Sequence, residues 1–345
     1  MNGDLTCFKS YDIRGDLTKN FDSEICYRIA RSFAMFLKAQ KVVVGRDARE
    51  SSPKLLDSIC RGLMDEGVKV LDIGLSGTEE MYWATTKYDA SGGIEVTASH
   101  NPINFNGLKL VKSGSNPISK DELLEIKRLA EVASFEKLNT RGERVDISND
   151  ARKNYVTKVL SFVDVSTFRD FKILVNSGNG AAGPTFDCIA NEIKKNNPRI
   201  CFNRMHHEVN SSFPNGIPNP ILPETHPRNQ RKILETGSDL GIAFDGDFDR
   251  CFFFDEKGNF VPGEYVVGLL AQISLMKEPG ATIIHDPRAI WNIQNIVSSN
   301  GGRSILSLTG HAFVKQAMRD NEAVYGGEMS AHHYFKEFSY CDSGM

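Results

Sequence analysis

Residues 41–73 read KVVVGRDARESSPKLLDSICRGLMDEGVKVLDI, and this stretch decides the class of fold. The β-branched run at 41–45 predicts a buried strand, the Ser- and Pro-initiated amphipathic stretch at 52–66 predicts a helix, and residues 68–73 predict the next strand. A strand, a polar loop, a helix and a second strand in succession are typical of layered α/β folds.

The same unit recurs along the chain. Further strands are expected at residues 93–97, at 172–175 before the loop NSGNG, and at 282–285 before the loop DPR. These repeated starts predict three consecutive related α/β domains. The charged, non-periodic segment 140–150 and the tight turn at 255–259 suggest their limits, which gives domains 1–146, 147–257 and 258–345. Residues 210–227 are rich in Pro, Asn and Ser and predict a long ordered loop.

Composition excludes several classes of protein. A hydrophobic fraction of 40% and a charged fraction of 25% are those of a soluble globular protein. The chain has no long apolar run and no basic start followed by an apolar core, so we expect neither a membrane span nor a secretory signal. The net charge of -3 provides no basic field for nucleic acid. Seven scattered cysteines without a C-x-x-C pair argue for reduced thiols in a cytoplasmic protein.

The first candidate site is the segment TASHNP at residues 97–102, which follows an expected strand. Ser99 should therefore lie in a loop at the carboxyl end of that strand, the side on which α/β sheets bind ligands. A serine in such a loop is most often a simple turn residue. His100 and Lys109 are suited to phosphate, however, and Gly107 allows a close approach of backbone. Lys109 is also a candidate general acid/base, or else a solvated surface lysine.

The second candidate site is the segment DGDFDR at residues 245–250, between two apolar runs. Asp245, Asp247 and Asp249 alternate along an extended segment, and three hard oxygen donors suit Mg²⁺. An EF-hand loop is the competing interpretation. It fails because Arg250 occupies the position that requires glycine and because the flanks are predicted strands.

The third candidate site is the segment GGEMSAHHY at residues 326–334. Glu328 and Ser330 follow a Gly-Gly turn and are placed to address sugar hydroxyls, whereas the adjacent His332 and His333 should point apart rather than share a metal. Smaller signals are Arg14 in YDIRG and a Thr-Gly-His motif with a following lysine, which suit phosphate. The residues of this motif are Thr309, Gly310, His311 and Lys315. Arg46 and Arg49 are expected to form structural ion pairs.

Together these segments resemble the α-D-phosphohexomutase family, and within it the bacterial phosphomannomutases of GDP-mannose and of capsule or colanic acid synthesis. The resemblance runs through the whole chain. It rests on YDIRG, GGIEVTASHNP, NGLKL, VNSGNGAAGP, FPNGIPNP, GIAFDGDFDRCFFFDE, TGHAFVK and GGEMSAHHYF. It implies mixed sheets sandwiched by helices, with a phosphoserine loop, a metal loop and a sugar loop in the three successive domains.

The resemblance also implies roles for single residues. Ser99 resembles the phosphoserine that donates and reaccepts the phosphoryl group. The implied Mg²⁺ ligands are Asp245, Asp247, Asp249 and the phosphorylated Ser99. The implied phosphate-facing and acid/base residues are Arg14, His100, Lys109 and Arg250, with Lys109 as the general base. The implied substrate-binding residues are Glu328, Ser330, His332, His311 and Lys315.

The implied reaction converts mannose 6-phosphate and mannose 1-phosphate into each other through a hexose 1,6-bisphosphate, which also serves as activator. The family usually has a fourth domain with a phosphate-gripping loop, and this sequence contains no such segment. Four alternatives therefore stay open: a phosphoglucomutase, another phosphohexomutase, a metal-dependent serine phosphatase, and an inactive sugar-phosphate-binding fragment. We expect a monomer or a weak dimer, without nucleic-acid or membrane partners.

Overall fold

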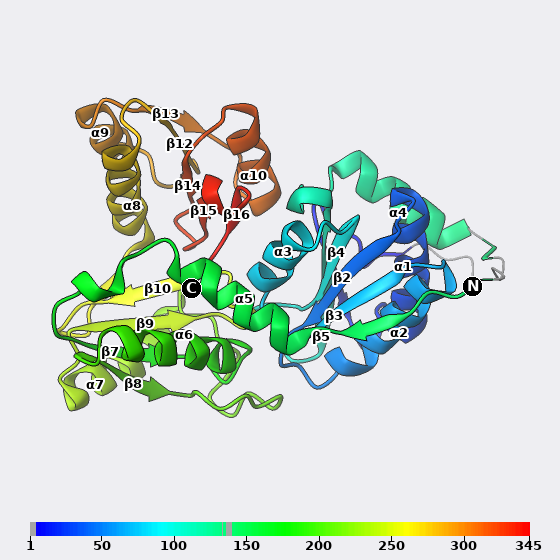
Figure 1. Cartoon of the computed structure of the whole chain (residues 1–345), viewed down its shortest axis with the longest axis horizontal. Coiled ribbons are helices and arrows are strands. Elements are labelled where there is room, and N and C mark those ends of the chain that lie inside the picture. Colours follow the sequence, from blue (N-terminus) through cyan, green and yellow to red (C-terminus); the bar gives the residue numbers. More distant parts are fainter. Residues whose placement is uncertain (1–4, 133, 136–139) are drawn as a thin grey trace. The chain divides into compact units, whose positions relative to one another are not determined.

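The structure is a computed structural model that describes residues 5–132, 134–135 and 140–345. The chain forms two units, one of residues up to 157 together with 209–217, and one of residues 158–208 together with 218–345. Each unit is described by itself. Figure 1 shows that both are built from sheets flanked by helices, as the alternation of strands and helices in the sequence predicts.

The first unit contains a mixed six-stranded sheet in the order β1-β5-β4-β2-β3-β6. Strands β4, β2, β3 and β6 run parallel. At one edge β5 pairs antiparallel with β4, and β1 pairs antiparallel with β5. Its strands are β1 (Ile13–Asp16), β2 (Lys41–Arg46), β3 (Lys69–Leu75), β4 (Gly92–Val96), β5 (Phe105–Lys112) and β6 (Arg144–Asp146). Its helices are α1 (Ser23–Leu37), α2 (Ser52–Asp65), α3 (Thr78–Lys87), α4 (Lys120–Val132) and the 3-10 turn η1 (Ser113–Ser115), with α5 (Ser148–Leu160) beginning in this unit.

The core of this unit lies under α1, α2 and α4. Their apolar faces share one buried cluster with the central strands, including Phe33, Ile59 and Val44. In Figure 1 α3 lies on the opposite face of the sheet. The strand and helix predicted at 41–45 and 52–66 are confirmed by β2 and α2.

Segment 140–150 is not an irregular linker. It contains β6, which pairs parallel with β3, and Arg144 forms ion pairs with Asp72 at 2.7 Å and with Asp57 at 2.7 Å. The charged side chain of Arg144 in this segment thus helps to attach a strand of the sheet. The three domain limits drawn from the sequence stay predictions.

The second unit contains two five-stranded mixed sheets. The first has the order β11-β10-β9-β7-β8, with β9, β7 and β8 parallel. Strand β10 pairs antiparallel with β9, and β11 pairs antiparallel with β10. Its strands are β7 (Phe171–Asn176), β8 (Ile200–Met205), β9 (Leu240–Phe244), β10 (Cys251–Phe254) and β11 (Phe260–Val261). Its helices are α6 (Ala182–Asn196) and α7 (His226–Thr236), with the 3-10 turns η2 (Val165–Thr167) and η3 (Pro223–Thr225). Ile233 of α7 packs on Leu174 and Phe254 of this sheet.

The other sheet of this unit has the order β13-β12-β14-β15-β16. Its strands are β12 (Thr282–His285), β13 (Arg303–Leu306), β14 (Tyr325–Gly327), β15 (His333–Phe335) and β16 (Cys341–Asp342). Its helices are α8 (Gly263–Lys277), α9 (Trp291–Ser299) and α10 (His311–Asp320), with the 3-10 turn η4 (Lys336–Phe338). One buried cluster joins α8 and α9 to the sheet and a second joins α10, so helices cover both faces.

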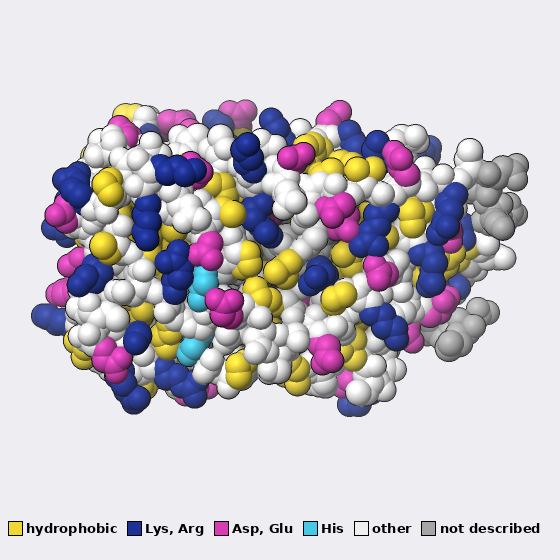
Figure 2. Space-filling model, turned by 60° about the horizontal axis from the view of Figure 1, so that its bottom comes forward, with side chains coloured by type: hydrophobic (Ala, Val, Ile, Leu, Met, Phe, Trp, Pro, Cys, Tyr) yellow, Lys and Arg dark blue, Asp and Glu magenta, His cyan; other side chains and the backbone are white. Residues whose placement is uncertain are grey.

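Basic and acidic side chains are mixed on the face of the described residues that Figure 2 draws. This mixture agrees with the net charge of -3. An anionic substrate must therefore be held by a local arrangement of charges. Among the described helices, none combines the length and apolarity that crossing a membrane requires.

Candidate active site

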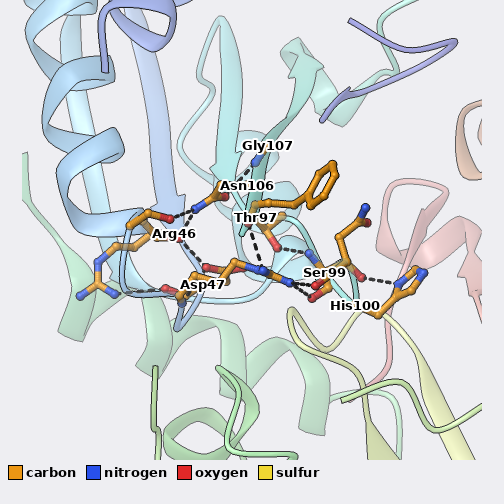
Figure 3. Close-up of polar contacts among 12 residues, drawn as sticks. Arg46, Asp47, Thr97, Ser99, His100, Asn106 and Gly107 are labelled. Atoms are coloured by element: carbon orange, nitrogen blue, oxygen red, sulfur yellow. Dashed lines mark hydrogen bonds and ion pairs between the residues drawn. The ribbon is translucent and has the colours of Figure 1, made fainter. Parts of the chain in front are cut away.

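Ser99 lies in the loop that follows β4, as the sequence predicts. It is 4% exposed, and its backbone adopts φ +49°, a left-handed conformation that side chains rarely take. The Ser99 amide donates to Thr97 Oγ1 at 2.8 Å, and Ser99 Oγ lies 3.1 Å from His100 Nδ1. Figure 3 shows this chain of contacts from Thr97 through Ser99 to His100. The loop thus presents a serine hydroxyl with an imidazole beside it, an arrangement found around nucleophilic serines.

Arg14 and Gly107 lie directly opposite each other in the pairing of β1 with β5. Arg14 is held by Asp12 at 2.9 Å and donates to the carbonyl of Thr97 at 3.3 Å, so it lies beside the strand that leads to Ser99. A Cβ added at Gly107 would lie 2.1 Å from the carbonyl oxygen of Ile13. The close approach predicted at Gly107 is therefore that of strand β1.

Lys109 is buried rather than solvated. It lies on β5 with 5% exposure and faces Glu95 of β4 in the antiparallel register, and Glu95 is itself fully buried. Ser76 Oγ donates to the Glu95 carboxylate at 3.1 Å. Burying a lysine costs desolvation free energy, which a buried carboxylate opposite it offsets only in part. This environment favours the functional interpretation of Lys109 over that of a surface lysine.

The acidic loop joins β9 to β10 in the second unit. Asp245, Asp247 and Asp249 are at most 1% exposed, and they place one carboxylate oxygen each within 4.8 Å of one another. Arg250 grips Asp245 through Nε at 3.0 Å and through a terminal nitrogen at 2.7 Å. Burial lowers the pKa of Arg250, but Asp245 and Asp249 outweigh it and leave that pKa above its usual value.

The acidic loop fits a divalent cation. Its three carboxylates and one guanidinium carry formal charges of minus three and plus one, all at or below 4% exposure. Buried charge of one sign is costly, and bringing in a small cation of high charge relieves it. Hard oxygen donors at this spacing suit Mg²⁺ or a similar ion. Ser99, the fourth predicted ligand, belongs to the other unit, and its part in the metal site stays a prediction.

The turn between β14 and β15 carries Glu328 and Ser330. The Glu328 carboxylate accepts from the Tyr334 hydroxyl at 2.6 Å, and it lies 3.4 Å from the guanidinium of Arg288 and 3.4 Å from Ser330 Oγ. Arg288 is in turn paired with the buried Asp286. Burial and the Glu328 charge raise the pKa of Tyr334 well above its usual value, which keeps it a hydrogen-bond donor. The turn therefore offers fixed polar groups of the kind that recognise a sugar.

Asp342 on β16 interacts with the remaining predicted substrate-binding residues, Lys315, His332 and His311. Its carboxylate lies 2.7 Å from Lys315 Nζ and accepts from His332 Nδ1 at 2.9 Å. Burial raises the pKa of Asp342, but Lys315, His332 and His311 outweigh this and hold it well below its usual value. Asp249 of the acidic loop lies within 4.8 Å of both His332 and Asp342. The acidic loop and the turn between β14 and β15 are thus neighbours in one unit.

These contacts fix the protonation pattern of His332. A carboxylate only accepts hydrogen bonds, so Nδ1 of His332 carries the proton and the other ring nitrogen is the acceptor in the neutral form. Burial lowers the pKa of His332, whereas Asp249 and Asp342 raise it, and the net shift is upward. His333 points elsewhere, to the Tyr325 hydroxyl at 2.7 Å. The two histidines therefore diverge as predicted, although His332 belongs to a group able to hold a metal.

Sequence reasoning missed Asp342, Arg288 and Tyr334. Arg288 follows β12 directly, and β12 is the parallel neighbour of β14, so both loops leave the same edge of the sheet. That placement was readable from the repeated strand-loop pattern. The sequence around Asp342 and Tyr334 did not indicate a role for them. Their contacts form only when β15 pairs antiparallel with β14 and β16 pairs antiparallel with β15.

Three comparisons with known proteins bear on this geometry. The chain matches phosphoglucomutase/phosphomannomutase alpha/beta/alpha domain I at residues 6–137, domain II at 153–258 and domain III at 262–345. It is 52% identical over 345 residues to a phosphomannomutase of Escherichia coli, and 50% identical over 348 residues to one of Vibrio cholerae serotype O1. In both cases 99% of this chain and 75% of the relative are covered.

Solved structures agree with the sequence comparison. A phosphoglucomutase/phosphomannomutase family protein from Burkholderia thailandensis superimposes with a TM-score of 0.90 at 30% identity, over 100% of this chain and 75% of that one. A protein described as a putative phosphomannomutase from Thermus thermophilus shares the fold with a TM-score of 0.87 at 22% identity, over 100% of this chain and 78% of that one. The mixed sheets flanked by helices are thus those of known proteins.

Proposed function

Because this chain belongs to the phosphoglucomutase/phosphomannomutase family, we propose that it is a phosphomannomutase that interconverts mannose 6-phosphate and mannose 1-phosphate. One observation carries the proposal from the chain's own geometry. The acidic loop that fits a divalent cation lies beside the sugar-type turn, with Asp249 within 4.8 Å of His332. A cation site next to fixed polar groups for hydroxyls suits phosphoryl transfer to a sugar.

In the proposed reaction the phosphorylated Ser99 is the donor. The bond from phosphorus to Ser99 Oγ breaks, a bond from phosphorus to the free sugar hydroxyl forms, and the hydroxyl proton passes to a base. The hexose 1,6-bisphosphate then reorients, and its other phosphate returns to Ser99. Arg14, His100 and Arg250 face phosphate in this scheme, and their positive or hydrogen-bonding groups offset its charge.

Several chain residues would prepare the sugar for transfer. Glu328 and Ser330, held by Arg288, would accept and donate hydrogen bonds to sugar hydroxyls. Lys109 is the proposed general acid/base, with His311 and Lys315 as further contacts to substrate. A Mg²⁺ held by Asp245, Asp247 and Asp249 would neutralise charge that builds up on the phosphoryl group. We also propose that the mannose 1-phosphate formed supplies GDP-mannose synthesis. The protein would act in the cytoplasm, with hexose 1,6-bisphosphate as its activator.

The test combines turnover with protein mass. Mannose 1-phosphate is incubated with the protein, Mg²⁺ and a trace of hexose 1,6-bisphosphate, and mannose 6-phosphate, free phosphate and the mass of the TASHNP peptide are followed. Conversion without stoichiometric phosphate, with one phosphoryl group on Ser99, supports the mutase. Ser99→Ala should abolish both signals.

Other outcomes would select the alternatives. Steady release of free phosphate would indicate a phosphatase, and binding without isomerisation would indicate a sugar-phosphate-binding protein. Faster conversion of glucose 1-phosphate than of mannose 1-phosphate would replace mannose by glucose in the proposal. Normal turnover by Ser99→Ala would remove the serine from the mechanism.

A further inference from the structure

Arg49 lies in the middle of the loop between β2 and α2 and contacts the backbone around Ser99. It is 2% exposed, and its two terminal nitrogens donate to four backbone carbonyls, three in the loop that follows β4 and one on the first residue of β5. The acceptors are the carbonyl oxygens of Ser99 at 2.9 Å, Asn101 at 2.5 Å, Pro102 at 2.9 Å and Phe105 at 3.0 Å. The structural ion pair predicted for Arg49 is present, to Asp47 at 3.4 Å, but it is a minor part of what this side chain does.

The hydrogen bonds that Arg49 donates to these four carbonyls fix the conformation of the Ser99 loop. Buried carbonyls need donors, and a loop without sheet neighbours must find them elsewhere. Ser99 itself sits at φ +49°, which an L-residue keeps only where its surroundings impose it. Its amide is held by Thr97 and its carbonyl by Arg49, so both peptide groups of Ser99 are anchored. These two anchors fix the backbone of Ser99 and therefore the direction of its Cα–Cβ bond, while Oγ contacts His100 Nδ1.

Arg49 is itself held in place by Asp47. Asp47 is 1% exposed; its Oδ1 accepts from the Arg49 amide at 3.0 Å and from Ser52 Oγ at 2.6 Å. The Asp47 amide in turn donates to the carbonyl of Val96 at the end of β4. Phe213, which belongs to the same unit, has its ring centroid 5.9 Å from the Arg49 guanidinium carbon. Figure 3 shows Asp47, Thr97 and Ser99 within one group of polar contacts.

We propose that Arg49, held by Asp47, is a positioning residue for phosphoryl transfer: it clamps the Ser99 loop so that Oγ is presented in one direction. The proposal rests on the proposed function of Ser99. Geometric demands support it, because in-line transfer depends on alignment and a misplacement of about 1 Å costs about a hundredfold in rate. Only arginine fills this position, since its planar fork offers five donors whereas a lysine offers three from a single point.

The decisive variant is Arg49→Lys, which keeps the charge and loses the fork. We expect kcat for mannose 1-phosphate conversion to fall about a hundredfold, while KM stays within about twofold because the sugar contacts lie on the 328–332 turn. Phosphorylation of Ser99 by hexose 1,6-bisphosphate should slow by the same factor. Amide hydrogen exchange in residues 97–106 should become faster, since the loop loses its donors. Arg46→Lys is the matched control: Arg46 precedes Asp47, donates to its carbonyl at 3.1 Å and should leave all four readouts unchanged.

Asp47→Asn provides a graded second variant if Arg49→Lys does not fold. Its amide oxygen still accepts from the Arg49 amide and Ser52, so we expect the fold to persist with an intermediate fall in kcat. A wild-type rate in Arg49→Lys, or a rise in KM at constant kcat, would overturn the positioning role. Unchanged hydrogen exchange in the loop would overturn the clamp whatever the activity. A wild-type protein that never phosphorylates Ser99 would refute the proposed function and the positioning role together, and the exchange comparison would still report on the clamp.

Discussion

The acidic loop leads to the most specific prediction, because its buried like charges lower the stability of the metal-free protein while they provide a site for a cation. Asp245, Asp247 and Asp249 lie buried with carboxylate oxygens within 4.8 Å of one another, and Arg250 supplies one positive charge. Replacing Asp247 by Asn removes one negative charge and keeps the shape of the side chain. The expected result is a protein that is more stable than the wild type without metal and less responsive to Mg²⁺.

The magnitude follows from the spacing. Two unit charges 4.8 Å apart repel by about 3.5 kcal/mol at an effective dielectric constant of about 20. Asp247 is repelled by two carboxylates and attracted by one guanidinium, so at comparable distances about one such repulsion remains. Hydrogen bonds to a charged group, worth about 1.5–3 kcal/mol, are weakened in the amide. The free energy of unfolding of the metal-free variant should therefore rise by about 0.5–2 kcal/mol, or about 1–8 °C in Tm for a body of this size.

The assay is thermal unfolding with EDTA and with Mg²⁺. In the wild type, Mg²⁺ at about a hundred times its Kd should add about 2.7 kcal/mol. In Asp247→Asn this gain should shrink by about 1.4 kcal/mol for each tenfold loss of affinity. Asp170→Asn is the control, since the Asp170 side chain is 79% exposed and should affect neither term. A metal-free Asp247→Asn that is less stable than the wild type, with an undiminished Mg²⁺ shift, would refute the reasoning.

Three further substitutions test other parts of the structure. Gly107→Ala places a Cβ 2.1 Å from the Ile13 carbonyl, so the free energy of unfolding should drop by about 3 kcal/mol or more in denaturant titrations. Glu328→Gln keeps an acceptor but removes the charge beside Arg288, so KM should rise in steady-state kinetics while Tm moves little. Asp187→Asn tests pH dependence: burial raises the pKa of Asp187, but hydrogen bonds from His207 and Arg204 outweigh it and the net pKa is lowered. Its stabilisation is therefore present above about pH 3.8 and is lost below, so wild-type and variant Tm values should converge in acid; a constant gap would contradict this.

The sequence predicted the fold well because local signals and long-range pairing agree. The run of valines at 42–44 becomes the fully buried centre of β2, and the Ser- and Pro-initiated stretch after it becomes α2. Segment 140–150 suggested a domain limit through its charges, and those charges gave no sign of the strand β6 that it contains. Only the folded sheet shows that Arg144 meets Asp72 and Asp57, two residues far away in the chain.

The candidate site could be predicted from the sequence where its residues lie close together in the chain and form a pattern. Asp245, Asp247 and Asp249 indicate a cation site by residue type and spacing. Ser99 is indicated by its neighbours His100 and Lys109 rather than by its place after a strand. Asp342 gave no such signal, because an isolated aspartate acquires meaning only when β16 pairs with β15 and brings it to His332.

Arg49 shows a related limit, since a pattern of residue types cannot reveal that a side chain will serve backbone carbonyls. Those acceptors are present at every position of the chain, and only the path of the loop selects four of them.

The second unit ties the cation site to the sugar-type turn through covalent and hydrogen-bonded connections. Asp249 is two residues from Cys251, whose amide donates to the carbonyl of Ala331 at 3.4 Å, and Ala331 lies next to His332 in the turn. Asp249 also acts on His332 through its charge. A cation that neutralises Asp249 therefore changes the electrostatic surroundings of the turn without touching it. It follows that substrate affinity and metal affinity should be coupled, and linkage requires each ligand to change the affinity of the other by the same factor.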